Sequence, residues 1–203
     1  MIYLSEPRKI LFIGAHTDDI ELSCGGAISK FIAQGHDVRC YVFSYCDNIQ
    51  LLLEFQRSMN VLGVNNYVLN TYDNRVINYF RQKVLQDLCD YKESFVPDYI
   101  FTHDVADIHQ DHSTIGMETL RAFKFHNIIS YTHPWNGDIN PNFFVSFGKA
   151  ELEKKIEACQ QYESQSHRHY MNEDMIRVNS LYWTNRSPYN QYCEAFNIIN
   201  LYD

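Results

Sequence analysis

The chain of 203 residues has no long hydrophobic run, although apolar residues make up 45% of it. A helix that crosses a membrane needs about 20 consecutive apolar residues, and no segment approaches that length. The N-terminal residues lead directly into a strand pattern and lack the apolar core and cleavage site of a signal peptide. We therefore expect a soluble protein, without stable membrane insertion, that stays in the cytoplasm.

Positive charge is scarce as well, because 17 Lys and Arg residues stand against 25 Asp and Glu residues, for a net charge of −8. The basic residues are scattered, so the chain lacks the basic stripe of a nucleic-acid-binding protein, and attachment to anionic lipid is disfavoured. We expect no nucleic-acid partner. A local basic pocket for a phosphorylated substrate is still compatible with this distribution.

The sequence also lacks paired cysteines and linker-like segments. Its six cysteines form no C-x-x-C pair and no short regular spacing, which disfavours a thiolate zinc site and predicts reduced, buried thiols. Such thiols are typical of a reducing cytoplasm. With 8 glycines, 5 prolines and no internal repeat, the chain is expected to form a single domain over 1–203.

What the chain does have is an alternation of strand and helix patterns. The apolar run 8–15 is typical of a parallel strand covered on both faces, and helical spacing over 25–35 follows it. Further strands are expected over 37–45, 67–73, 98–104, 127–134, 143–147 and 194–201, and helices over 50–62, 81–95, 113–124, 149–163 and 172–182. This succession predicts an α/β fold, a Rossmann-like, mostly parallel sheet with helices on both faces.

Two segments rich in histidine and aspartate follow predicted strands at equivalent places. AHTDDIE (15–21) comes directly after the first strand, and DIHQDH (107–112) shortly after the fourth. In a doubly wound sheet the ligand crevice lies beyond the carboxyl ends of the strands, where the strand order reverses. In the common order 3-2-1-4-5 this point falls between strands one and four, so we expect the two segments to face each other across one cleft.

The side chains of these segments suit a metal ion. His16 and Asp19 are spaced i, i+3, as are His109 and His112, so each pair points to one side if its segment enters a helical turn. Two imidazoles and one carboxylate with an open position form a typical catalytic zinc set, which also accepts Fe(II), Co(II) or Mn(II). Taken separately, the Asp-Asp pair also fits a helix cap near Ile20, and the second segment fits a polar loop.

These motifs resemble those of the PIG-L/LmbE-like zinc-dependent N-deacetylases, which act on GlcNAc-phosphatidylinositol and other GlcNAc conjugates. The family patterns A-H-P-D-D-x-E and D-x-H-x-D-H are matched by AHTDDIE and DIHQDH. Supporting matches are Glu54…Leu62-Gly63, KKIEACQQYESQ (154–165) and EAF (194–196). The resemblance spans nearly the whole chain and looks closest to bacterial members that act in glycan biosynthesis.

The resemblance implies hydrolysis of the N-acetyl amide of an N-acetylated sugar, free or linked to a nucleotide or lipid, to give acetate and an amino sugar. By position, His16, Asp19 and His112 would be the ligands of a zinc ion. The native metal, the sugar, its aglycone and the formation of a homo-oligomer stay open.

Three further residues receive roles from the resemblance. Asp18 takes the place of the general base, which later delivers the proton to the leaving amine. His109, if protonated, would stabilise the oxyanion. Asp111 would orient a histidine or adjust its charge.

The chain departs from the family pattern in two places. Thr17 replaces the proline of the first motif, and Leu53 stands where many members carry a substrate-binding arginine. Arg57 and Arg75 are candidate replacements for that arginine, and Asp73 matches a family aspartate that binds sugar hydroxyls. A plain surface role fits these three equally well.

Other histidines have ordinary explanations beside functional ones. His103 ends the fourth strand near the cleft and is a candidate substrate contact. The segment HPWN (133–136) would place an aromatic ring beside a sugar or in the core, and HRHY (167–170) would bind a phosphate or form a solvated loop.

Three rival functions follow from the same sequence. The metal site would also serve a non-sugar amide. A nucleotide-binding Rossmann module is disfavoured, because the first strand–helix turn lacks G-x-G-x-x-G and would present carboxylates to a pyrophosphate. A non-catalytic sugar- or nucleotide-binding homologue is disfavoured, because the ligands, the base and the electrophile are all present.

Overall fold

A computed structural model describes residues 6–133, 135–136, 140–186 and 191–202. Within these residues seven strands form one sheet in the order β3-β2-β1-β4-β5-β7-β6. The strands are β1 (Lys9–His16), β2 (Asp37–Ser44), β3 (Asn66–Leu69), β4 (Tyr99–His103), β5 (Asn127–Tyr131), β6 (Phe143–Phe147) and β7 (Tyr192–Asn200). Neighbours among β1 to β5 pair in parallel, whereas β7 is antiparallel to β5 and β6. The predicted α/β fold and the strand order around β1 and β4 are confirmed.

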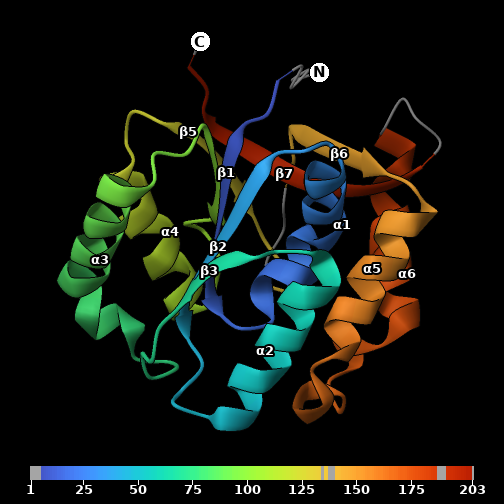
Figure 1. Cartoon of the computed structure of the whole chain (residues 1–203), viewed down its shortest axis with the longest axis horizontal. Helices are drawn as coiled ribbons and strands as arrows, with labels where there is room; N and C mark the ends of the chain where they lie inside the picture. The colour runs from blue at the N-terminus through green and yellow to red at the C-terminus, as the bar shows by residue number, and fades with distance from the viewer. Residues whose placement is uncertain (1–5, 134, 137–139, 187–190, 203) are drawn as a thin grey trace.

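Helices cover both faces of this sheet (Figure 1). The α-helices of the described residues are α1 (Asp19–Ala33), α2 (Ile49–Leu62), α3 (Arg81–Ser94), α4 (Gln110–Ala122), α5 (Lys149–Gln160) and α6 (Glu173–Tyr182). Short 3-10 turns lie at Ile77–Phe80, Glu163–Gln165, His169–Met171 and Trp183–Arg186. One face of the sheet packs against α1, α2, α5 and α6, and the other against α3 and α4.

β1 shows why a continuous apolar run becomes the central strand. Successive side chains of a strand point to opposite faces, and Ile10 and Phe12 belong to the core beneath α1, while Leu11 and Ile13 belong to the core beneath α3 and α4. All four are fully buried. The burial of these side chains fixes the position of β1 in the sheet. It therefore also fixes where the segment after β1 begins.

Two boundaries differ from the expectation in a way that shapes the site. α4 begins at Gln110, three residues before the expected 113, because His109 caps it: the backbone N–H of Asp111 donates to His109 Nδ1 at 3.2 Å. β3 ends at Leu69 rather than 73, and the chain then turns through Arg75, whose φ is +67°. Asp111 and the residue after it thus lie in the first helical turn.

α4 approaches the end of β4 closely. A Cβ added at Gly116 would lie 2.4 Å from the carbonyl oxygen of His103, so only glycine permits this approach. The first turn of α4 is thereby brought to the carboxyl ends of the parallel strands, where ligands bind in such folds. Among the described residues no helix is both long and apolar enough to span a membrane.

Candidate active site

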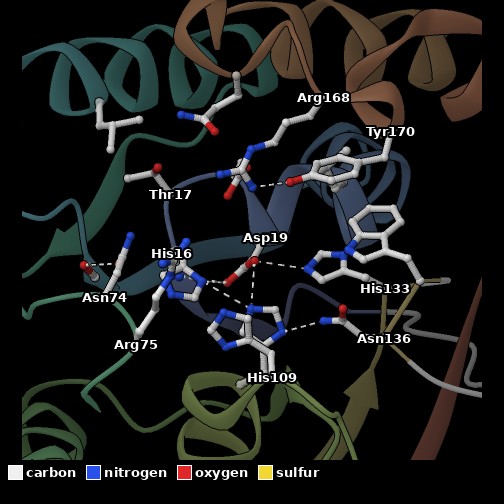
Figure 2. A pocket seen from close by; sticks show the side chains of 17 residues that line it. His16, Thr17, Asp19, Asn74, Arg75, His109, His133, Asn136, Arg168 and Tyr170 are labelled. Atoms are coloured by element: carbon white, nitrogen blue, oxygen red, sulfur yellow. Dashed lines mark hydrogen bonds and ion pairs between the residues drawn. The ribbon is translucent and has the colours of Figure 1, made fainter.

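Four possible donor atoms, contributed by three residues, meet at the carboxyl ends of β1 and β4. His16 Nδ1 lies 3.2 Å from His112 Nε2 and 3.4 Å from Asp19 Oδ2, and His112 Nε2 lies 3.3 Å from Asp19 Oδ1. Around a tetrahedral ion with bonds of about 2.0–2.1 Å, ligand atoms are about 3.3–3.4 Å apart. The two segments therefore face each other across one cleft, where two imidazole nitrogens and the two oxygens of one carboxylate lie close enough for a cation to bind among them (Figure 2).

A second carboxylate contacts the outer nitrogen of each imidazole. Asp111 Oδ2 lies 3.1 Å from His16 Nε2, and Asp107 Oδ2 lies 3.0 Å from His112 Nδ1. Each ring thus directs one nitrogen to a carboxylate and the other to the centre, an arrangement that fixes the tautomer and orientation of metal-binding histidines. The family resemblance implied such a role for Asp111, whereas nothing in the sequence indicated the equivalent contact of Asp107.

The protonation of the metal-free centre reflects these carboxylates. Burial lowers the pKa of His16 and His112, but Asp19 and the outer carboxylates outweigh it and raise the pKa to about 10 and about 9. Burial raises the pKa of Asp19, yet His112, His103 and His16 hold it well below its usual range. A bound divalent cation would displace the extra protons from these rings.

Two further buried histidines approach Asp19. His103 Nε2 lies 3.0 Å from Asp19 Oδ2, and His133 Nε2 lies 3.1 Å from Asp19 Oδ1. The backbone N–H of Ala15 points at His103 Nε2 at 3.0 Å, so the lone pair of that nitrogen is already used. Burial, followed by His112, lowers the pKa of His103 to about 3. A neutral His103 that accepts the Ala15 N–H has no hydrogen on Nε2 to donate to Asp19, although its donor atom lies within 4.8 Å of those of Asp19, His112 and His133.

Asp18 is the N-cap residue of α1, yet its side chain makes no capping hydrogen bond. Its carboxylate lines the cavity above the donor atoms. Burial and then the neighbouring Asp19 raise its pKa above that of a free carboxyl group, which is the direction expected of a general base. Capping thus does not explain the Asp-Asp pair of the first segment.

His109 is neutral in this arrangement. Its Nδ1 accepts the backbone N–H of Asp111, and its ring stacks on His112 with centroids 4.4 Å apart. Burial, and then His112 and His16, lower its pKa to about 4. The structure therefore favours a neutral ring that carries its proton on Nε2, rather than the protonated form considered from the sequence. A neutral imidazole can still donate one hydrogen bond into the cavity.

Comparison with known proteins decides the family. The family model "PIG-L: GlcNAc-PI de-N-acetylase" matches residues 11–123, which include both histidine segments. The chain belongs to the PIG-L family. A curated relative, the uncharacterized deacetylase YaiS of Escherichia coli (strain K12), is 26% identical over 175 residues, which cover 77% of this chain and 91% of YaiS.

Solved structures share the fold of this PIG-L family member. The conserved protein TT1542 of Thermus thermophilus matches with a TM-score of 0.80 and 21% identity over 97% of both chains. The N,N'-diacetylchitobiose deacetylase of Pyrococcus horikoshii matches with a TM-score of 0.73 and 18% identity over 97% of this chain and 85% of its own. At this identity the matches show a common fold, in agreement with the predicted LmbE-like architecture.

A cavity of about 180 Å³ opens above the donor atoms of this PIG-L family protein. Arg75 lines it, as proposed for a substrate-binding residue. Arg57 instead donates to the carbonyl oxygen of Gln161 at 3.2 Å and lies outside the lining, and Asp73 lines a separate hollow. The wall also contains side chains that the sequence signalled weakly or not at all, namely Asn74, Trp135, Asn136, Gln165, Arg168 and Tyr170.

Proposed function

We propose that this PIG-L family protein is a zinc-dependent deacetylase that hydrolyses the N-acetyl amide of an N-acetylated sugar and releases acetate and an amino sugar. One observation carries the proposal: His16 Nδ1 and His112 Nε2 lie 3.2 Å apart and each lies 3.3–3.4 Å from one of the two oxygens of Asp19, with the carboxylate of Asp18 beside them in the cavity. The family description and the names of the relatives, a deacetylase and a diacetylchitobiose deacetylase, support the same reaction.

The donor set fits zinc, because two imidazoles, one carboxylate and an open side toward the cavity are typical of catalytic zinc sites. Fe(II), Co(II) and Mn(II) accept the same donors, so zinc is the first metal to test. When bound, such an ion supplies Lewis-acid activation of the amide carbonyl and lowers the pKa of water. Asp111 and Asp107 would hold the two imidazoles in the required orientation.

Asp18 and His109 would perform the proton transfers and the charge stabilisation. The Asp18 carboxylate accepts the proton of the attacking water and passes it to the nitrogen of the leaving amine. His109 donates its Nε2 hydrogen to the carbonyl oxygen, on which negative charge develops. A neutral donor suits this place, since a second cation beside the His16 and His112 rings is electrostatically disfavoured.

The sugar assignment draws on the chemistry of the cavity and on the relatives. About half of the residues that line the cavity carry an amide, guanidinium or hydroxyl group, and the amides belong to Asn74, Asn136 and Gln165. Such groups bind sugar hydroxyls. The motifs that resemble bacterial members lead us to place the reaction in glycan biosynthesis in the cytoplasm. The competing hypothesis is the same site acting on a non-sugar amide.

The test is a screen for released acetate with N-acetylglucosaminides, N-acetylated nucleotide sugars and lipid-linked sugars, with and without added zinc. Asp18→Asn should bind metal stoichiometrically and lose about 10²–10⁴-fold in kcat, the usual contribution of a general base. The matched control is Asp104→Asn, at a carboxylate that accepts the backbone N–H of Ala106 at 2.9 Å and lies outside the cavity lining. An active Asp18→Asn enzyme would refute the base assignment. A zinc-loaded enzyme that releases acetate only from non-sugar amides would refute the sugar assignment.

A further inference from the structure

Two arginines at the cavity lack a carboxylate partner among the described residues. Arg75 and Arg168 both line the cavity, and no described carboxylate oxygen lies within 4.0 Å of either guanidinium. Six other arginines have such a partner at 2.5–4.0 Å: Arg8, Arg39, Arg57, Arg81, Arg121 and Arg177. In a chain with a net charge of −8, arginines without carboxylate partners at a cavity indicate a ligand that supplies the negative charge.

Arg75 is held in place by its backbone. Its φ of +67° is uncommon for a residue other than glycine. Its N–H donates to Asp111 Oδ2 at 2.6 Å, and its carbonyl accepts from Gln110 Nε2 at 3.0 Å. Such backbone strain persists where the surroundings impose it, often at ligand-binding sites. The same Asp111 orients His16, so the backbone from which the Arg75 side chain extends is fixed relative to the centre of the cavity.

Arg168 is positioned by a different set of contacts. The buried Glu54 accepts the backbone N–H of Ser164 at 2.9 Å and its hydroxyl at 2.5 Å, which anchors the segment that leads to Arg168. Tyr170 stacks on Trp135 with centroids 4.1 Å apart, and the Arg168 guanidinium donates to the Tyr170 hydroxyl. Figure 2 shows Arg168 and Arg75 approaching the group around Asp19 from different sides of the cavity.

The negative charge of the site explains why an anionic substrate would need positively charged side chains at the cavity. Asp18 and Asp19 present carboxylates to the same cavity, and these would repel an anionic substrate. Burial lowers the pKa of Arg168, but the Tyr170 hydroxyl and the nearby Asp18 and Asp19 outweigh it and raise the pKa. The Arg168 guanidinium is therefore charged at every physiological pH. A guanidinium binds phosphate and carboxylate oxygens through two parallel hydrogen bonds, whereas a neutral sugar needs no such group.

We propose that Arg75 and Arg168 bind an anionic group, a phosphate or a carboxylate, that the substrate carries next to its N-acetylated sugar. This inference rests on the proposed function, because it assigns the substrate class of the same cavity. It makes a charged conjugate, rather than a neutral N-acetylglucosaminide, the preferred substrate.

The kinetic test compares kcat/KM for three substrates: N-acetylglucosamine 1-phosphate, 2-carboxyethyl N-acetylglucosaminide and the neutral methyl N-acetylglucosaminide. Arg168→Gln removes one guanidinium, and Arg75→Asn removes the other with a residue that tolerates positive φ. Each variant should lose about 10–100-fold of the preference for an anionic over the neutral substrate, as expected for a charge-assisted hydrogen bond. The control Arg8→Gln removes a guanidinium that pairs with Asp98 at 3.9 Å outside the cavity, and it should leave the preference unchanged.

A binding measurement separates failure of this inference from failure of the proposed reaction. Calorimetry with Asp18→Asn protein should show that N-acetylglucosamine 1-phosphate binds more tightly than the methyl glycoside and loses that advantage when Arg75 or Arg168 is replaced. Arginine-dependent binding without acetate release by the wild type would support the anionic subsite and refute the reaction. A wild type without anionic preference would overturn the inference. An equal loss of kcat/KM on all three substrates in Arg168→Gln, together with a shifted pH profile, would also overturn the inference, because Arg168 would then act through Asp18. Comparison of the phosphate-bearing substrate with the carboxylate-bearing one identifies which anion is preferred.

Discussion

Replacing Asp107 by asparagine tests whether one outer carboxylate sets the metal affinity of the site. Asp107 Oδ1 accepts the backbone N–H of His109 at 2.8 Å, and Oδ2 faces His112 Nδ1 at 3.0 Å. In the variant the amide oxygen would keep the contact with His109, which leaves the amide NH₂ facing His112 Nδ1. The imidazole would then have to carry its proton on Nε2, the nitrogen that faces the centre.

The size of the effect follows from the hydrogen bond that is lost. A hydrogen bond to a charged group contributes about 1.5–3 kcal/mol and a neutral one about 0.5–1.5 kcal/mol. Loss of the charge alone should therefore weaken zinc binding by about 1–2 kcal/mol, or about 5- to 30-fold in Kd. The unfavourable tautomer adds to this loss, in line with the 10–100-fold effects known for residues that orient metal-binding histidines.

Competition with a chelator of known affinity measures the zinc Kd of Asp107→Asn and of two references, the wild type and Asp104→Asn. Asp104 lies in the same loop and accepts from the Ala106 backbone N–H at 2.9 Å and the Ser130 hydroxyl at 2.7 Å, but it contacts no metal-facing imidazole. Thermal unfolding of the metal-free proteins shows whether both variants fold. A Kd within twofold of the wild type, or an equal loss in Asp104→Asn, would refute the reasoning.

Two other predictions concern the same centre and the helix that carries it. Apparent zinc affinity should rise by at least about tenfold per pH unit between pH 6 and 8, because the pKa values of His16 and His112 are raised to about 10 and about 9 and zinc must displace at least one proton from these rings. Chelator competition across this range checks the slope, and a pH-independent affinity would contradict it. Gly116→Ala should destabilise the metal-free protein by about 1–2 kcal/mol, since overpacking against the His103 carbonyl at 2.4 Å exceeds the gain in helix propensity. Chemical denaturation measures this, and a more stable variant would argue against the close approach.

The features that the sequence predicted well are those encoded locally. A buried parallel strand needs a continuous apolar run, so the position of β1 follows from residues 8–15 alone. The meeting of the two histidine segments follows from strand order, because the carboxyl ends of β1 and β4 adjoin where the order reverses. Neither inference depends on the direction of any single side chain.

The features that were missed depend on contacts between distant segments. Glu54 was noted only as part of a pattern, yet it is buried and anchors Ser164, 110 residues later. Lys155 and Glu194 belong to two of the supporting matches and form a buried ion pair of 2.6 Å. Spacing along the chain cannot show that such residues pair. The role of HRHY (167–170) was left open for the same reason, since its place at the cavity depends on these anchors.

Asp111 links the two halves of the site in a way that its motif alone does not reveal. One of its oxygens, Oδ2, contacts both His16 Nε2 at 3.1 Å and the backbone N–H of Arg75 at 2.6 Å, and the other accepts from the Ile77 backbone N–H at 3.2 Å. Because one carboxylate holds a metal-facing imidazole and the turn that carries a cavity arginine, the backbone at Arg75 and the imidazole of His16 are held to the same group. The second histidine segment therefore sets where the Arg75 side chain leaves the backbone relative to the donor atoms, and the positive φ of Arg75 is the backbone strain that accompanies this placement.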